Sequence, residues 1–367
     1  MSDLLREKRG ALDELRGLAI CAVLASHVAL VFRSNVELAR VLLVPALGVG
    51  VDLFFVISGF LIVERAARST AKAGEFWCGA AAFWAGRVIR IGVPAWVTIA
   101  ALFVAWRLGV AQGLRVEDLI AAGTFVGNFY WAPCFAGVEG CGDPLLSSHF
   151  WSLGIEAQFY ALAPFLAALG RRSIWIIVSL ALVAGAMAWR PWGGFWWALR
   201  VDALLVGVLI GMETRWRADW LTRVPKIGLE LATYWLLVAA MLARVLSNGV
   251  SGVGLVMVAL IFGAVLAGRR RDVVAREPLG GRLLRWIGER SYSIYLVHLP
   301  ILSTLRPVLL EHAPGWVAAA IATTGVLIAA LYLEQWVTGP SKILARRVAA
   351  RICEATKASL PVEGANG

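Results

Sequence analysis

The stretch LDELRGLAICAVLASHVALVF, from Leu12 to Phe32, decides the fold class. It is apolar enough and long enough to cross a bilayer as a helix, which takes about 20 residues. His27 lies deep within it, where an ionisable side chain is costly and by default indicates a functional site. Arg16 precedes His27 by eleven positions. Because a helix turns about 100° and rises about 1.5 Å per residue, the two share one face about 16 Å apart.

The rest of the chain has the same apolar character. Of its 367 residues 60% are hydrophobic, and mean hydropathy is +0.75, whereas soluble domains contain about 45–50% apolar residues. We therefore predict an all-α integral membrane protein with membrane lipids as partners. Lys and Arg exceed Asp and Glu by 11, but the cations cluster between apolar runs, as orientation signals do. Nucleic acid is not an expected partner.

The apolar runs predict about ten transmembrane helices. They lie near Leu12–Phe32, Pro45–Val63, Val88–Leu108, Ser152–Leu169, Ile174–Ala188, Trp197–Met212, Gly228–Leu246, Val250–Ala267, Trp286–Leu310 and Gly315–Val337. Gly207 and Gly211 form a GxxxG pattern that favours close helix packing. We assign residues 1–340 to one transmembrane domain and residues 341–367 to a short polar cytoplasmic tail.

Loop charges predict the orientation. With the N-terminus inside, nearly all Lys and Arg residues of the loops fall on the inner side, so both termini are expected in the cytoplasm of a bacterial inner membrane protein. The first apolar run lacks a cleavage site and is expected to remain as a span. The longest outer connection contains Cys134 and Cys141, which can pair if that side is oxidising.

His27 is the first candidate for chemistry. A neutral imidazole suits a general base that takes a proton from a hydroxyl; the alternative is a core histidine bonded to a neighbouring helix. Asp52, on the next span, is expected at a similar depth and could orient the imidazole as a triad carboxylate does. Its alternative role is to cap the start of the second span.

Arg87 and Arg90 lie together at the cytoplasmic end of the third predicted span. Fork-shaped guanidinium groups recognise phosphate. The competing interpretation is that both serve only as orientation signals.

Glu156 lies inside an apolar span, so its carboxylate should face a partner in the interior. Two roles are open for it: catalysis, or an ion pair with Arg200. The alternative for Arg200 is an ion pair with Asp202 at the start of the sixth span. Ser291, Tyr295 and His298 follow the spacing of one helix face, and His298 is either a site residue or a packing contact.

Common nucleotide and hydrolase signatures are absent from the sequence. It has no Walker loop, dinucleotide fingerprint, HExxH or GxSxG, and the cysteines form no metal-like cluster. This counts against an ATP-driven pump, a zinc protease and a serine hydrolase, and no metal is expected.

Five segments, in order, resemble the membrane acyltransferase-3 family of bacterial O-acyltransferases, and the resemblance covers Leu12 to about Val337. The segments are LDELRGLAICAVLASH, GVDLFFVISGFLI, FWAGRVIRI, HFWSLGIEAQFY and IGERSYSIYLVHLPIL. Ala157 departs from the acidic residue common after the family's glutamate, and Glu14 stands where glycine is frequent. Some relatives carry a further C-terminal hydrolase-like domain, so this chain would act alone or with a separate partner.

The resemblance implies a function, and together with the positions of the residues it leads us to expect a set of roles. It implies an acyl-coenzyme A donor, acetyl-CoA being the expected one, on the cytoplasmic side and an essential His27. Arg16, Arg87 and Arg90 would hold the donor's phosphates, with Glu156 and Asp52 as further catalytic residues. Arg200, Tyr295 and His298 would contact the acceptor, a glycan such as O-antigen, exopolysaccharide or a lipid-linked sugar. The alternatives are acylation of a small natural product such as a macrolide and, from another class, a glycan transporter or flippase.

Overall fold

The protein is described by a computed structural model that covers residues 2–32, 47–73, 75–138, 140–188, 194–217, 223–247, 252–271 and 279–359. Every element in these ranges is helical, in agreement with the predicted all-α class. Five segments are long and apolar enough to cross a membrane: Gly10–Phe32, Phe76–Arg107, Phe195–Trp216, Ser291–His312 and Gly315–Ile352. The count of ten spans and the side of the termini stay predictions.

The first half of the bundle carries most of the predicted site. Its long helices are α1 (Ser2–Phe32), α3 (Gly50–Ala73), α4 (Phe76–Arg87), α5 (Val93–Arg107) and α9 (Phe150–Ala168). A π-helical turn, η1 (Val88–Gly92), joins α4 to α5 without a break. Such turns occur often at functional sites, and this one carries Arg90.

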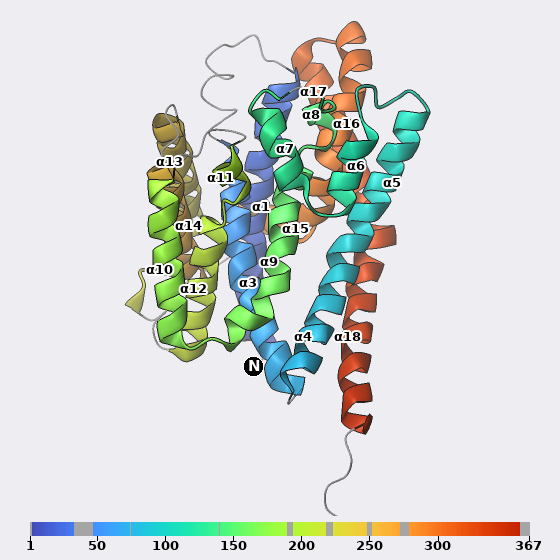
Figure 1. The fold of residues 1–367 in the computed structure, drawn as a ribbon. Helices are drawn as coiled ribbons and strands as arrows, with labels where there is room; N and C mark the ends of the chain where they lie inside the picture. Colours follow the sequence, from blue (N-terminus) through green and yellow to red (C-terminus); the bar gives the residue numbers. More distant parts are fainter. Residues whose placement is uncertain are drawn as a thin grey trace, which may run out of the picture.

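The second half completes the bundle (Figure 1). Its elements are α10 (Arg171–Met187), α11 (Phe195–Ala198), α12 (Asp202–Trp216), α13 (Leu229–Ser247), α14 (Gly252–Arg271), α15 (Leu279–Glu289), α16 (Ser291–His312), α17 (Gly315–Leu333), η3 (Glu334–Thr338) and α18 (Gly339–Ser359). The predicted starts of the second and eighth spans, Pro45 and Val250, lie outside the described residues.

Glycines set the closest helix contact in the core. A Cβ at Gly207 on α12 would overlap the carbonyl oxygen of Val56, and one at Gly59 on α3 would overlap that of Leu204. Only a residue without a side chain permits this approach. A Cβ at Gly211 would overlap the side chain of Val63 on α3, so the close packing predicted from the GxxxG pattern is confirmed.

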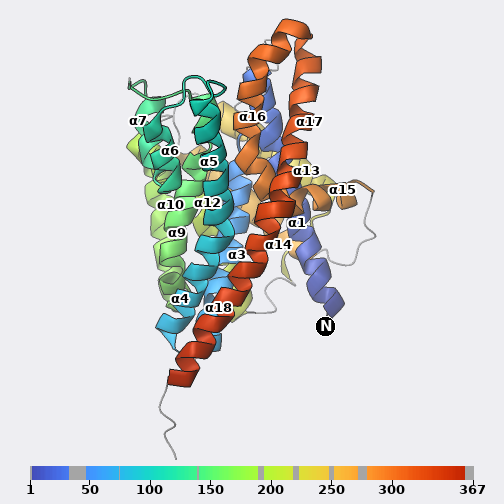
Figure 2. The same cartoon turned by 90° about the vertical axis from the view of Figure 1, so that its right-hand side faces the viewer.

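Three segments differ from the predicted spans. The predicted span Val88–Leu108 is part of the continuous helical segment Phe76–Arg107, so Arg87 and Arg90 lie near its middle and not at its end. The run Trp286–Leu310 is divided at Arg290 into α15 and α16, and α15 packs on α1 across the direction of the long helices (Figure 2). Toward the C-terminus, η3 joins α17 to α18 in one continuous helical segment. The domain boundary predicted at residue 340 therefore falls inside a helix that packs against α4 and η1.

The connection between α5 and α9 folds into α6 (Val116–Gly123), α7 (Gly127–Phe135) and α8 (Pro144–Ser147). Cys134 and Cys141 form a disulfide there. Asp118 accepts hydrogen bonds from the Tyr130 hydroxyl and from the backbone nitrogens of Arg115 and Gly142. Burial and the bond to Asp118 raise the pKa of the Tyr130 hydroxyl well above its ordinary value, so Tyr130 stays a neutral donor.

Candidate active site

A cavity between α1, α3, α4, η1, α9, α15, α16 and α18 has an empty volume of about 920 Å³, counting its open mouth. Its charged lining is strongly unbalanced. Five cations reach it, and the acidic side chains of the lining are Glu156 and Glu289. The cations are Arg16, Arg65, Arg87, Arg90 and Lys342. Three of them, Arg16, Arg87 and Arg90, are the predicted phosphate ligands.

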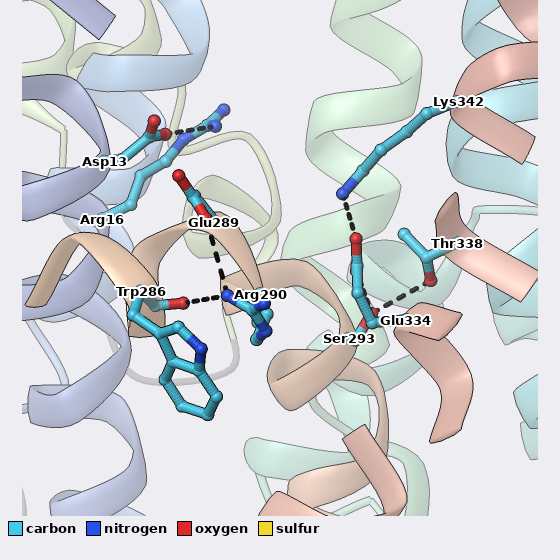
Figure 3. Close-up of polar contacts among 9 residues, drawn as sticks. All are labelled: Asp13, Arg16, Trp286, Glu289, Arg290, Ser293, Glu334, Thr338 and Lys342. Carbon is cyan, nitrogen blue, oxygen red and sulfur yellow. Dashed lines mark hydrogen bonds and ion pairs between the residues drawn. The ribbon is translucent and has the colours of Figure 1, made fainter. Parts of the chain in front are cut away.

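Most of these arginines lack an acidic partner. Arg16 lies 3.6 Å from Asp13, as Figure 3 shows, but none of the ion pairs among the described side chains involves Arg65, Arg87 or Arg90. The guanidinium of Arg87 is positioned by aromatic faces, 5.3 Å from the Phe83 ring and 5.1 Å from the Tyr160 ring. Fixed guanidiniums without carboxylates suit an anionic ligand.

Tyrosines and Glu156 line the deeper part of the cavity. The hydroxyl of Tyr160 donates to Glu156 at 2.6 Å. Tyr295 donates to the carbonyl of His149 at 2.8 Å, which leaves its oxygen to accept from the Ser152 hydroxyl at 2.6 Å. Because Ser152 and Tyr295 both line the cavity, their bond forms part of its wall.

Three histidines pack behind Tyr295. The His298 ring lies 4.9 Å from that of His27, 5.2 Å from that of His149 and 5.3 Å from that of Tyr295, between ring centroids. None of the three histidines belongs to the cavity lining. We call them the histidine cluster. It joins α1 to α16 and to the turn before α9.

A backbone carbonyl fixes the tautomer of each of these imidazoles. His149 uses Nε2, which lies 3.2 Å from the carbonyl of Leu296, whereas His27 and His298 use Nδ1. Nδ1 of His27 lies 2.9 Å from the carbonyl of Val23, and Nδ1 of His298 lies 2.6 Å from that of Tyr295. A carbonyl only accepts, so in these two rings Nδ1 carries the proton and Nε2 presents a lone pair. Nε2 of His298 is buried without a hydrogen-bond partner among the described residues. An unprotonated Nε2 can take a proton from a hydroxyl.

Asp52 and Arg200 form a buried pair instead of the expected contacts. Arg200 donates to Asp52 at 2.6 Å, with both side chains 10% exposed. The expected contact between Asp52 and His27 is therefore not formed. The His27 imidazole bonds to the carbonyl of Val23 instead, and the Asp52 carboxylate bonds to Arg200. Arg200 likewise pairs with Asp52 rather than with Glu156, whose partner is Tyr160.

The structure thus brings most of the predicted residues to one region. Arg16, Arg87, Arg90, Glu156 and Tyr295 line the cavity. His27 and His298 lie together behind it, and Asp52 and Arg200 form a separate pair.

Sequence reasoning missed Arg65, Lys342 and His149 as site residues. In the sequence Arg65 follows the second predicted span and Lys342 lies in the predicted tail, where cations indicate orientation rather than a site. Only His149 had a local signal, its place at the head of the HFWSLGIE block.

Fold and site together define a class: helical membrane proteins with an internal, cation-lined cavity that ends near buried histidines. The profile of an acyltransferase domain matches residues 9–334. The chain therefore belongs to the acyltransferase-3 family, as the sequence motifs predicted.

Characterised relatives are similar at 24–28% identity. They include the peptidoglycan O-acetyltransferase OatA of Listeria monocytogenes (28%, 88% of this chain and 54% of the relative). The O-acetyltransferase OatA of Staphylococcus aureus matches at 24%, over 88% and 55%. Nodulation protein 10 of Rhizobium leguminosarum matches at 27%, over 84% and 85%. The chain thus spans about half the length of the O-acetyltransferases. No solved structure gives a significant match.

Proposed function

We propose that the protein is an integral membrane O-acyltransferase that transfers an acetyl group from acetyl-CoA to a hydroxyl of a glycan. The observation that carries the proposal is the cavity itself, which is lined by Arg16, Arg87 and Arg90. Its lining residue Tyr295 packs against His298, which in turn packs against His27. Membership of the acyltransferase-3 family and the names of the relatives support the same reaction.

The donor fits the cavity by its chemistry. Coenzyme A carries phosphates at one end and the thioester at the end of a long flexible arm. In the proposal the guanidiniums of Arg16, Arg87 and Arg90 bind the phosphates, and the arm points toward Tyr295. The rise of about 16 Å along α1 from Arg16 to His27 is of the order of the arm's length.

In the proposed reaction His27 acts as the base. Nε2 takes the proton of the acceptor hydroxyl while the hydroxyl oxygen forms a bond to the thioester carbonyl carbon. The C–S bond breaks, and the coenzyme A thiolate leaves and receives the proton from the imidazolium. His298, with its bare Nε2 beside the His27 ring, and Glu156 are the nearest candidates to assist. An acyl-histidine intermediate is the alternative route.

The proposed acceptor is a surface or lipid-linked glycan, with a small natural product as the alternative. Two relatives are named for O-acetyl transfer, one of them on peptidoglycan. A second cavity, of about 980 Å³ with its open space, is mostly apolar and shares Arg87, Ile91 and Tyr160 with the first. An apolar neighbour to the charged cavity favours an acceptor that approaches from within the membrane.

The proposed location is the bacterial inner membrane, with both termini and the cavity mouth in the cytoplasm. The cations near that end of the bundle support this orientation. Reporter fusions at each terminus test it: both are expected to report cytoplasmic exposure, and an external terminus would contradict it.

The test of function uses purified full-length protein in detergent with radiolabelled acetyl-CoA and glycan acceptors. We expect wild-type protein to consume the thioester and to move the label onto the acceptor. Lack of turnover with any acyl-CoA, together with flux of glycan across vesicles containing the protein, would support a transporter instead.

A further inference from the structure

We propose that Lys342 is a donor-binding residue, a cation of the cavity supplied by a helix that lies beyond the family-matched residues 9–334. The proposal rests on the proposed function, because the ligand it assigns to Lys342 is a phosphate of the acyl-CoA donor. In the sequence Lys342 is one of several cations in the predicted polar tail. Its proposed role follows only from the packing of α18 beside the cavity.

The continuous segment α17–η3–α18 brings Lys342 to the cavity. The π-helical turn η3 lies between the apolar helix α17 and the charged helix α18, whose first two residues are Gly339 and Pro340. Helix α18 then packs against α4 and η1, which carry Arg87 and Arg90. Two helices with π turns thus place Lys342, Arg87 and Arg90 on the same cavity.

A polar network holds the Lys342 side chain in place (Figure 3). Its ammonium donates to Oε1 of Glu334 at 2.6 Å, and the other carboxylate oxygen accepts from the Ser293 hydroxyl at 2.8 Å. Ser293 also lies 3.0 Å from the hydroxyl of Thr338. Glu334 is therefore tied to α16 and Lys342 is tied to Glu334, so the ammonium is fixed relative to the neighbouring arginines.

This arrangement leaves Lys342 able to bind an anion. An ammonium has three N–H donors, and Glu334 is its one partner among the described hydrogen bonds. The side chain is 24% exposed, and it lines the cavity. Glu334 is not part of the lining, so the positive charge, not the carboxylate that orients it, meets a ligand.

A purely structural role for the pair makes a different prediction. If Lys342 only neutralises Glu334, then removal of Lys342 and removal of Glu334 should lower the stability of the protein by similar amounts. Each variant should then affect turnover with every donor to the same extent. If Lys342 binds phosphate, its removal should matter only for donors that carry phosphate, and Glu334→Gln should spare the donor KM because the cation remains.

The experiment compares full-length variants in detergent with two donors, acetyl-CoA and S-acetylpantetheine, which lacks phosphate. We expect Lys342→Met to raise KM for acetyl-CoA about tenfold, the effect of losing one charge-assisted contact, and to leave KM for S-acetylpantetheine unchanged. Lys342→Arg should restore the acetyl-CoA value. Arg351→Met, which removes an exposed cation of the same helix outside the cavity lining, is the matched control.

The outcomes separate this proposal from the function on which it rests. Wild-type turnover with an unchanged acetyl-CoA KM in Lys342→Met would overturn the role of Lys342 alone. Equal losses for both donors in Lys342→Met and Glu334→Gln would show a structural pair and would also overturn it. Wild-type protein that neither binds coenzyme A nor consumes acetyl-CoA would overturn both proposals.

Discussion

The cavity and the histidine cluster lie on either side of Tyr295 and are built in opposite ways. The cavity is open at its mouth and collects cations, of which Arg65, Arg87 and Arg90 have no acidic partner in the described ion pairs. The histidine cluster lies behind the lining, and each of its three imidazoles uses a backbone carbonyl as a partner. One region retains charge for a ligand, whereas the other holds neutral rings in fixed tautomers.

This difference indicates a division between binding and chemistry. Unpaired guanidiniums attract phosphate but carry out no proton transfer, because they stay protonated. Neutral imidazoles can exchange a proton but attract no anion. The predictions below test this division through variants of each region.

The largest expected effect comes from the histidine cluster. Without the proposed base, His27→Ala should lower turnover by about 10²–10⁴-fold, while the affinity for coenzyme A stays that of wild type. Steady-state kinetics and titration with coenzyme A measure the two quantities. The matched control is His312→Ala, an exposed histidine of α16. Wild-type turnover in His27→Ala would sink the base assignment.

The Asp52–Arg200 pair should show its effect mainly in stability. Loss of one member leaves an uncompensated buried charge, so Asp52→Ala and Arg200→Met should each destabilise the protein by about 3–5 kcal/mol. The double variant should lose less than the sum of the two. Denaturant unfolding in detergent measures this. Unchanged stability in Asp52→Ala, with turnover as low as that of His27→Ala, would instead support the catalytic role predicted for Asp52 from the sequence.

Substitution of Arg87 tests the role of the cavity in donor binding. Arg87→Ala should raise the donor KM about tenfold, from the loss of a charged contact, and should lower kcat by less. Arg107→Ala, at the exposed end of α5, is the control. A donor KM equal to that of wild type would assign Arg87 to membrane orientation alone.

The smallest expected effect lies at the boundary between the two regions. Tyr295→Phe removes the hydroxyl that bonds Ser152 and the His149 carbonyl but keeps the ring against His298. We expect a loss of about 0.5–1.5 kcal/mol in stability and an unchanged donor KM. A raised donor KM would show that the hydroxyl contacts the donor.

Local motifs were sufficient to find much of the site. Arg16 and His27 share one helix, and Arg87 and Arg90 lie three positions apart, so helix geometry alone relates the members of each pair. The structure does bring Arg16, Arg87, Arg90, Glu156 and Tyr295 to one cavity. Their roles in binding and catalysis stay predictions.

Contacts between distant segments could not be predicted in the same way. Arg200 reaches Asp52 across 148 positions because α12 packs against α3, and sequence spacing does not give that packing. Lys342 appeared as a tail charge because the apolar pattern ends near Val337, although the helix continues through η3 into α18. The break at Arg290 was missed because α15 and α16 read as one apolar run.

The most direct test of the division is to measure coenzyme A binding and acetyl-CoA turnover on the same preparations of His27→Ala and Arg87→Ala. The account predicts opposite profiles: His27→Ala binds coenzyme A like wild type but has lost turnover, and Arg87→Ala binds weakly but approaches wild-type turnover at saturating donor. If His27→Ala loses binding and turnover in equal proportion, the two regions are not functionally separate and the account is contradicted.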